Sequence, residues 1–265
     1  VRIAATYDFA VDPETFAAVR RNAAEISVVS AERIAAELRR MLGQPRRRRA
    51  ADLLQRSGLL ETILPEVALV AQDGMSAPWQ TTLDILDAVE SDEFAVGFAV
   101  LLRPGLVAGG QGPAAIRGIG ERLRLTTREQ RDLAFFVRNE ASVLQARSLP
   151  WPTLQRILIQ EPAGGLLSYA EAISSVLGEH RADVEFCRER LQLPPAALNP
   201  PVLITGNDLK RLGIPAGPAY RPILDAVRDA QLDQRVRSRD DALELARQLA
   251  DEHPPASIRP QNGTP

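Results

Sequence analysis

The side chains in this sequence best suited to a chemical task are the four consecutive arginines at 46–49, which follow Pro45. A guanidinium group donates paired hydrogen bonds to phosphate oxygens, and such contacts hold a nucleic acid without reading its bases. Arg39 and Arg40 lie shortly before this run, and Arg56 follows it. The spacing predicts either a surface that contacts a sugar-phosphate backbone or the solvated start of a helix.

A metal-dependent or hydrolytic centre is not predicted. A divalent-metal site needs several His or Asp ligands that converge on one ion, and the chain has two histidines, His180 and His253. Residues 61–100 carry eight acidic and no basic side chains, a pattern typical of a solvated acidic face. The glycine-rich stretch 109–112 lacks the strand-to-helix context of a phosphate-binding loop. We therefore expect no catalytic residue and no metal ligand in this chain.

Composition places the chain among ordinary globular proteins. Of its 265 residues, 45% are hydrophobic and 25% are charged, and the net charge is −2. No apolar run approaches the roughly 18 residues that span a bilayer, and no signal peptide opens the sequence, so no membrane partner is expected. Cys187 is the single cysteine and cannot form an internal disulfide, which favours the reducing cytoplasm.

Positive charge is unevenly distributed along the chain. Residues 1–60 carry 11 basic and 7 acidic side chains, and residues 101–147 carry 8 basic and 4 acidic ones. Phosphate contacts are therefore expected in these two segments.

Helix signals recur along the chain, and no convincing strand or internal repeat interrupts them. Asp12 before Pro13 predicts one helix start, and Ser30 predicts the next. A Gly- and Pro-rich loop is expected at 104–113. Further helices are expected at about 46–57, 82–89, 93–102, 114–123, 127–138, 150–160 and 166–191.

The last third of the chain has strong punctuation. The proline-rich stretch 194–201 predicts a rigid, extended linker. Residues 254–265 are expected to be disordered. Two pairs between these stretches have the spacing of a capping box, Thr205 with Asp208 and Ser238 with Asp241.

Three segments resemble a known family. Residues 1–42 read VRIAATYDFAVDPETFAAVRRNAAEISVVSAERIAAELRRML, and residues 56–65 read RSGLLETILP. Residues 198–246 read LNPPVLITGNDLKRLGIPAGPAYRPILDAVRDAQLDQRVRSRDDALELA. The first two are similar to the neck, and the turn after it, of the class II tRNA nucleotidyltransferase/poly(A) polymerase family. The third resembles the carboxy-terminal module of bacterial members. The resemblance implies an all-α neck, body and tail without the catalytic head, whose nucleotide-selecting motif would fall before Val1.

Many members of that family carry a metal-dependent HD phosphohydrolase domain between these segments. At the positions of its metal ligands this sequence has Thr81, Arg103-Pro104 and Asn139-Glu140. The resemblance therefore implies an HD-like helical body that has lost its ligands. The expected domains are a neck over 1–66, this body over 67–192, a small helical module over 193–253 and a tail over 254–265.

The resemblance also implies a function. The parent enzyme would add CCA to tRNA 3′ ends with CTP, ATP and Mg²⁺, while this chain, with no cofactor and no catalytic centre of its own, holds the tRNA for the head. Residues expected to brace the nucleotide pocket are Arg2, Glu32, Arg33 and Glu37, of which Arg33 and Glu37 are spaced to pair with each other. Residues expected to contact RNA are Arg39, Arg40, Arg46, Arg47, Arg48, Arg49, Lys210, Arg211, Tyr220 and Arg221.

Three alternatives stay open at this point. The first is a poly(A) polymerase of the same family, and the second is a standalone helical module for RNA binding or dimerisation. The third is an HD phosphohydrolase with unusual ligands. The expected partners are tRNA and the catalytic head, and the sequence makes no prediction of oligomeric state.

Overall fold

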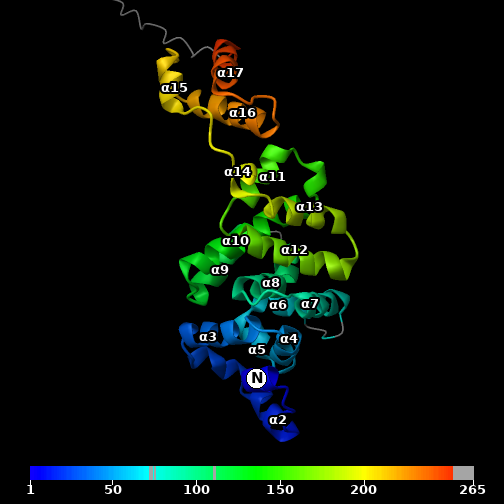
Figure 1. Cartoon of the computed structure of the whole chain (residues 1–265). Helices are drawn as coiled ribbons and strands as arrows, with labels where there is room; N and C mark the ends of the chain where they lie inside the picture. Colours follow the sequence, from blue (N-terminus) through cyan, green and yellow to red (C-terminus); the bar gives the residue numbers. More distant parts are fainter. Residues whose placement is uncertain (72–73, 75, 110–111, 253–265) are drawn as a thin grey trace, which may run out of the picture. The chain divides into compact units, whose positions relative to one another are not determined.

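The computed structural model describes residues 1–71, 74, 76–109 and 112–252. Throughout these residues the regular structure is helical and no strand is present, which confirms the predicted all-α fold (Figure 1). No described helix is both long and apolar enough to cross a membrane. The predicted disordered tail and His253 lie outside the described residues.

The helices pack into two units. The first unit contains Val1–Leu149 and Gln160–Gln192, and the second contains Pro150–Ile159 together with the described chain from Leu193 onward. The finer division into neck, body and module stays a prediction.

The first unit is built around one apolar helix, α8. This helix contacts α3, α6, α7, α10 and α12, and residues such as Phe98 and Leu101 are fully buried in it. A helix at the centre of a domain is apolar on every side, because all of its faces are buried. The helices of this unit are α1 (Arg2–Tyr7), α2 (Pro13–Arg21), the 3-10 helix η1 (Ala23–Val28), α3 (Ala31–Leu42), α4 (Arg47–Arg56), α5 (Leu59–Ile63), α6 (Pro65–Ala71), α7 (Ala77–Ala88), α8 (Phe94–Gly109), α9 (Gly112–Arg122), α10 (Thr127–Leu144), the 3-10 helix η2 (Ala146–Ser148), α12 (Ala163–Leu177) and α13 (Arg181–Leu191).

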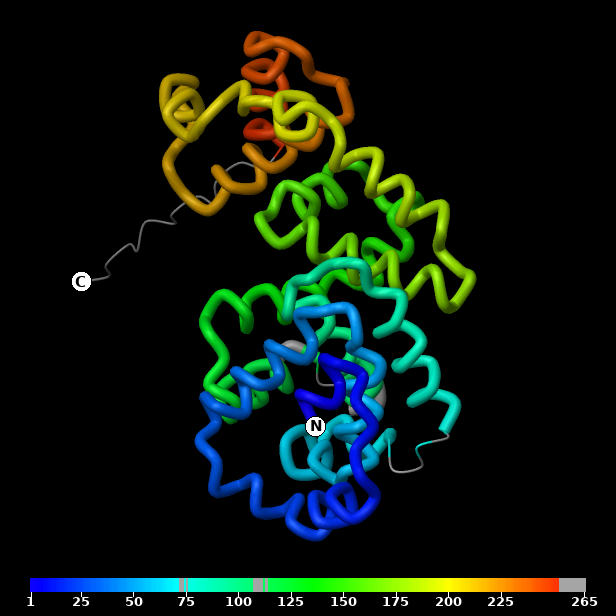
Figure 2. Tube along the Cα trace, turned by 60° about the horizontal axis from the view of Figure 1, so that its bottom comes forward, coloured from blue at the N-terminus to red at the C-terminus, as the bar shows by residue number. Residues whose placement is uncertain are grey.

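The first helices start where the sequence predicts. The Asp12 carboxylate accepts a hydrogen bond of 2.9 Å from the backbone N–H of Thr15, with Pro13 at the first helical position of α2. Such a cap stabilises a helix by about 1 kcal/mol. Ser30 is the N-cap residue of α3, although its side chain makes no capping hydrogen bond. Helices α1, α3 and α4 contact one another and lie side by side at the blue end of the trace in Figure 2.

The predicted loop at 104–113 is wrong in its first part. Helix α8 continues through Pro104 to Gly109, and α9 begins again at Gly112, while residues 110 and 111 lie outside the described residues. Proline removes one helical hydrogen bond, but the packing of α8 against α6 offsets this cost. Gly105 allows that packing, because a Cβ there would lie 2.4 Å from the carbonyl oxygen of Glu66 at the start of α6.

The single helix expected over 166–191 is also wrong, because the chain turns between α12 and α13. Gly178 ends α12 in the left-handed conformation (φ 73°), and its N–H donates to the carbonyl of Ser174. His180 is left-handed as well (φ 61°) and serves as the N-cap residue of α13. Glycine at such a helix end adopts positive φ without steric cost.

The second unit contains α11 (Trp151–Leu158), α14 (Pro195–Leu198), α15 (Gly206–Arg211), α16 (Tyr220–Leu232) and α17 (Arg239–Glu252). Helix α14 lies within the stretch expected to be an extended linker, because Pro195 has the φ that a first helical residue needs. Both predicted capping boxes are confirmed. Asp208 accepts from the N–H and hydroxyl of Thr205 at 2.8 and 2.9 Å. Ser238 and Asp241 bond reciprocally at 3.0 and 3.1 Å.

Candidate nucleic-acid interface

The arginine run at 46–49 does not form one free basic surface. Arg47 is 1% exposed and acts as a structural residue. Its Nε donates to the Leu42 carbonyl at 2.7 Å and its Nη1 to the Val89 carbonyl at 2.9 Å, and its Nη2 bonds the Ser91 carbonyl. Burial lowers the pKa of Arg47, although Asp92, 3.5 Å away, acts in the opposite direction. This guanidinium links the end of α3 to the segment after α7 and is not available to a phosphate.

The other three arginines of the run are more accessible, but each has an acidic partner. Arg49 lies 3.0 Å and Arg46 3.8 Å from the carboxylate of Asp8. Arg48 forms an ion pair with Asp84. The run therefore holds the first turn of α4 to neighbouring segments, and a phosphate would compete with these carboxylates.

Arg39 makes a two-pronged contact with Glu129, at 2.5 and 2.7 Å. The same carboxylate accepts a hydrogen bond of 2.8 Å from the N–H of Thr126 at the start of α10. Burial of Glu129 raises its pKa, but the hydrogen bonds from Arg39 and Thr126 outweigh burial, and the resulting pKa is below the usual value. The hydrogen bond to Glu129 raises the pKa of Arg39. This contact joins α3 to α10.

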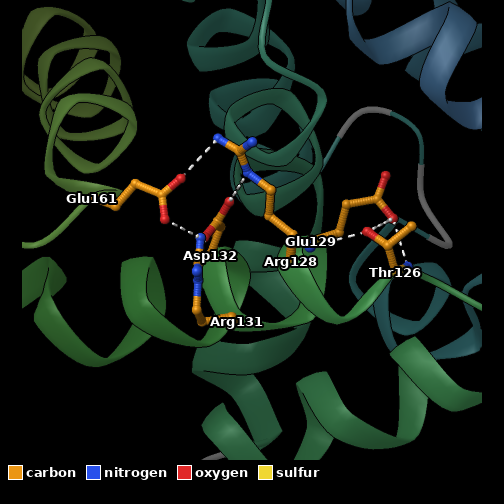
Figure 3. A network of polar contacts seen from close by, with 6 residues as sticks. All are labelled: Thr126, Arg128, Glu129, Arg131, Asp132 and Glu161. Carbon is orange, nitrogen blue, oxygen red and sulfur yellow. Dashed lines mark hydrogen bonds and ion pairs between the residues drawn. The ribbon is translucent and has the colours of Figure 1, made fainter.

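Two basic residues of the second positive segment are paired in the same way. Figure 3 shows Arg128 and Arg131 of α10 beside the carboxylates of Asp132 and Glu161. Arg131 lies 2.9 Å from Asp132 and 3.0 Å from Glu161, and Arg128 lies 3.3 Å from Glu161. Two arginines between two carboxylates leave little net charge for a ligand.

The predicted pocket-bracing residues lie mostly at one hollow. A hollow of about 910 Å³ in the first unit is lined by Arg2, Arg33 and Glu37, and its apolar lining includes Ile34. Glu37 forms ion pairs with Arg2 and with Arg40, the latter at 2.7 Å, rather than with Arg33, as its spacing had suggested. Arg33 is exposed, and so is Glu32, which does not line the hollow.

The predicted RNA-contact residues of the second unit occupy two neighbouring helices. The hydroxyl of Tyr220 donates to the Ile214 carbonyl at 2.8 Å, so this ring is held against the segment that follows α15. Arg221 is 93% exposed, with Asp225 at 3.8 Å, and Arg211 lies 3.5 Å from Asp208. Lys210 is exposed on α15.

A network of polar residues lies where the HD resemblance would place metal ligands. Arg103 donates to Glu140 at 2.9 Å, and the Tyr169 hydroxyl donates to the same carboxylate at 2.6 Å. Burial raises the pKa of Tyr169 well above its ordinary value. Thr81 is half-buried, and its hydroxyl donates to the Ala77 carbonyl within its own helix. Across the part of the chain that the structure describes, no three His, Cys, Asp or Glu side chains gather in a way that could hold a metal ion.

A second hollow in the first unit, which is basic, was not predicted from the sequence. It has a volume of about 700 Å³ and is lined by Arg20, Arg21 and Arg56, with Phe16 at its edge. The signal in the sequence is the pair of consecutive arginines at the end of α2, Arg20 and Arg21, which has no acidic residue in the four positions before it. It was overlooked because the run at 46–49 is denser.

Comparison with known proteins first finds a family model that matches part of the chain. Residues 8–70 match the family model described as the probable RNA and SrmB-binding site of polymerase A. This region runs from the end of α1 into α6. It contains every lining residue of the second hollow, and all but a few of those of the first.

Two relatives then make the resemblance more particular. The chain is 28% identical over 279 aligned positions to a multifunctional CCA protein of Paraburkholderia phytofirmans, an alignment that covers 92% of this chain and 64% of the relative. It is 56% identical over 48 residues to an A-adding tRNA nucleotidyltransferase of Geobacter sulfurreducens, which covers 18% of this chain and 6% of that protein. Together with the family model, these matches confirm the predicted resemblance to the tRNA nucleotidyltransferase/poly(A) polymerase family. The chain thus spans less than two thirds of the length of either relative.

Proposed function

We propose that this chain is the RNA-holding part of a CCA-adding tRNA nucleotidyltransferase. The observation that supports this most strongly is the alignment of 92% of the chain with a multifunctional CCA protein. The match of residues 8–70 to an RNA-binding family model adds support from an independent comparison. In this role the chain holds tRNA in a reducing cytoplasm and positions its 3′ end for nucleotide addition by a catalytic head.

The chemistry of nucleotide addition belongs to that head in this proposal. Mg²⁺ with ATP and CTP would be bound there, since two-metal catalysis needs clustered carboxylates. The described residues of this chain do not fit such a site, because their acidic side chains are not gathered in threes. Arg2, Arg33 and Glu37 would act indirectly, by bracing the head across the hollow that they line.

The proposed RNA contacts follow from accessibility. Arg40, Arg46, Arg48 and Arg49 remain in the set, because their guanidinium groups are at least partly exposed. Arg39 is retained, although a phosphate would compete with Glu129 for its guanidinium group. Arg47 is left out because it is buried. In the second unit the proposed contacts are Lys210, Arg211, Tyr220 and Arg221.

A poly(A) polymerase of the same family is the second candidate, because the family model that matches is described as a binding site of polymerase A. The two differ in the RNA that this chain should prefer. We expect the chain to bind folded tRNA at least tenfold more tightly than an unstructured RNA of equal length, measured by competition against labelled tRNA. Equal affinity for folded tRNA and unstructured RNA would favour a poly(A) polymerase. Binding of neither RNA would refute the proposed function.

A further inference from the structure

The basic hollow at the end of α2 contains residues that were not among the RNA contacts predicted from the sequence. Its walls are the end of α2 with η1, and the end of α4 with α5. Arg20, Arg21 and Arg56 contribute three positive charges to its lining, and Glu61 contributes one negative charge. The hollow therefore has an excess of two positive charges and suits an anion.

Two of these arginines differ from those of the run at 46–49. Arg20 and Arg21 are exposed, and neither has a carboxylate within ion-pair distance among the described residues. By contrast, Arg48 and Arg49 each have an acidic partner. A phosphate at Arg20 and Arg21 displaces no internal ion pair, so its full attraction is available for binding.

An aromatic side chain lies at the edge of the same hollow. The Arg56 guanidinium lies 5.6 Å from the centre of the Phe16 ring. Phe16, Arg20 and Arg56 also line an adjoining hollow of about 490 Å³, to which Arg49 and Asp52 contribute. The Asp52 carboxylate lies 3.3 Å from the Arg56 guanidinium. An aromatic ring and a guanidinium plane are the two surfaces on which proteins stack unpaired bases.

We propose that these adjoining hollows bind a single-stranded stretch of RNA. Arg20 and Arg21 would contact its phosphates, and a base would stack on the pair formed by Phe16 and Arg56. The inference rests on the proposed function, because it names the part of the RNA and the residues that this region would hold. All of these residues lie within the segment 8–70 that matches an RNA-binding family model.

The test uses the whole chain and a fluorescein-labelled single-stranded RNA of eight nucleotides, with binding measured by anisotropy at several salt concentrations. Loss of two phosphate contacts in Arg20→Gln/Arg21→Gln should make the slope of log K against log salt shallower by about 1.4, at about 0.7 per phosphate of a single strand. The matched control is Arg181→Gln/Arg247→Gln, which removes the same charge from exposed helix positions outside the hollows. The control should keep the wild-type slope.

Phe16→Leu separates stacking from charge, because it keeps an apolar side chain and removes the ring. Its affinity for the labelled RNA should fall roughly fivefold or more with no change in slope. Melting curves followed by circular dichroism check that each variant is folded. The inference is overturned if the Arg20/Arg21 variant keeps the slope of its control, which would also be the outcome if the hollows serve a protein partner. Binding of tRNA by the unmodified chain would then still support the proposed function.

Discussion

Gly97 of α8 lies directly against the buried side chain of Arg47. A Cβ at position 97 would lie 3.1 Å from Cδ of Arg47 and 2.6 Å from the carbonyl oxygen of Leu42. The same carbonyl accepts the Nε hydrogen bond of Arg47. A glycine in the central apolar helix thus makes the space in which an arginine can be buried and bonded.

Gly97→Ala should destabilise the first unit. Alanine is favoured over glycine in a helix by about 1 kcal/mol. The new methyl group, however, overlaps the Leu42 backbone, and such overpacking destabilises a fold by about 1–3 kcal/mol. We expect a net loss of roughly 1 kcal/mol or more in the free energy of unfolding by urea. Gly118→Ala in α9 is the matched control, because a Cβ there meets nothing within 4 Å, and it should be neutral or stabilising. A Gly97→Ala variant as stable as Gly118→Ala would contradict this account of the close approach.

Arg47→Met should be among the most destabilising single changes in the chain. It leaves the carbonyls of Leu42 and Val89 without their donors in a buried place, and each buried acceptor left unbonded costs about 1–3 kcal/mol. Arg46→Met, at an exposed position with a 3.8 Å ion pair, should change stability by less than about 1 kcal/mol. Urea unfolding of the two variants gives the comparison. Equal, small effects would show that Arg47 is solvated instead of buried.

Arg103 and Glu140 should behave as a coupled pair. Their side chains are 25% and 18% exposed, and Glu140 also accepts from Tyr169. Arg103→Met leaves the carboxylate without its cation, whereas adding Glu140→Gln removes that charge. A double-mutant cycle should therefore give a coupling energy of about 1 kcal/mol or more. Additive effects would place the two groups outside one network.

The second unit should lose stability in acid through Asp208. Hydrogen bonds from the backbone N–H and hydroxyl of Thr205, and then from Arg239, lower the pKa of Asp208 from 3.8 to about 2. A lowered folded-state pKa stabilises the fold above the unfolded-state pKa, and this contribution is lost as pH falls from about 4 towards 2. Asp208→Asn should flatten the part of the melting-temperature profile that lies in this window. Parallel profiles for the variant and the wild type would contradict the assignment.

Local sequence predicted the features that depend on a few neighbouring residues. The caps at Asp12, Thr205 and Ser238 are confirmed, because each needs one side chain and a backbone N–H three residues away. The all-α fold follows from helix signals of this kind throughout the chain.

Features that depend on distant partners were not predictable in this way. The continuation of α8 past Pro104 depends on the approach of Gly105 to the Glu66 backbone. The burial of Arg47 depends on carbonyls more than 40 residues away, at Val89 and Ser91. An arginine run looks equally basic in sequence whether carboxylates lie beside it in the fold or not. For this reason the sequence favoured residues 46–49 over Arg20 and Arg21.

The salt dependence of tRNA binding by the intact chain tests the central proposal most directly. If the chain holds RNA through arginine–phosphate contacts, its affinity should fall steeply between about 50 and 200 mM salt, by roughly a hundredfold if about four phosphates are neutralised. Anisotropy of labelled tRNA over this range measures the slope. Binding that is absent at low salt, or that does not change with salt, would contradict the role of this chain as the RNA-holding part of a tRNA nucleotidyltransferase.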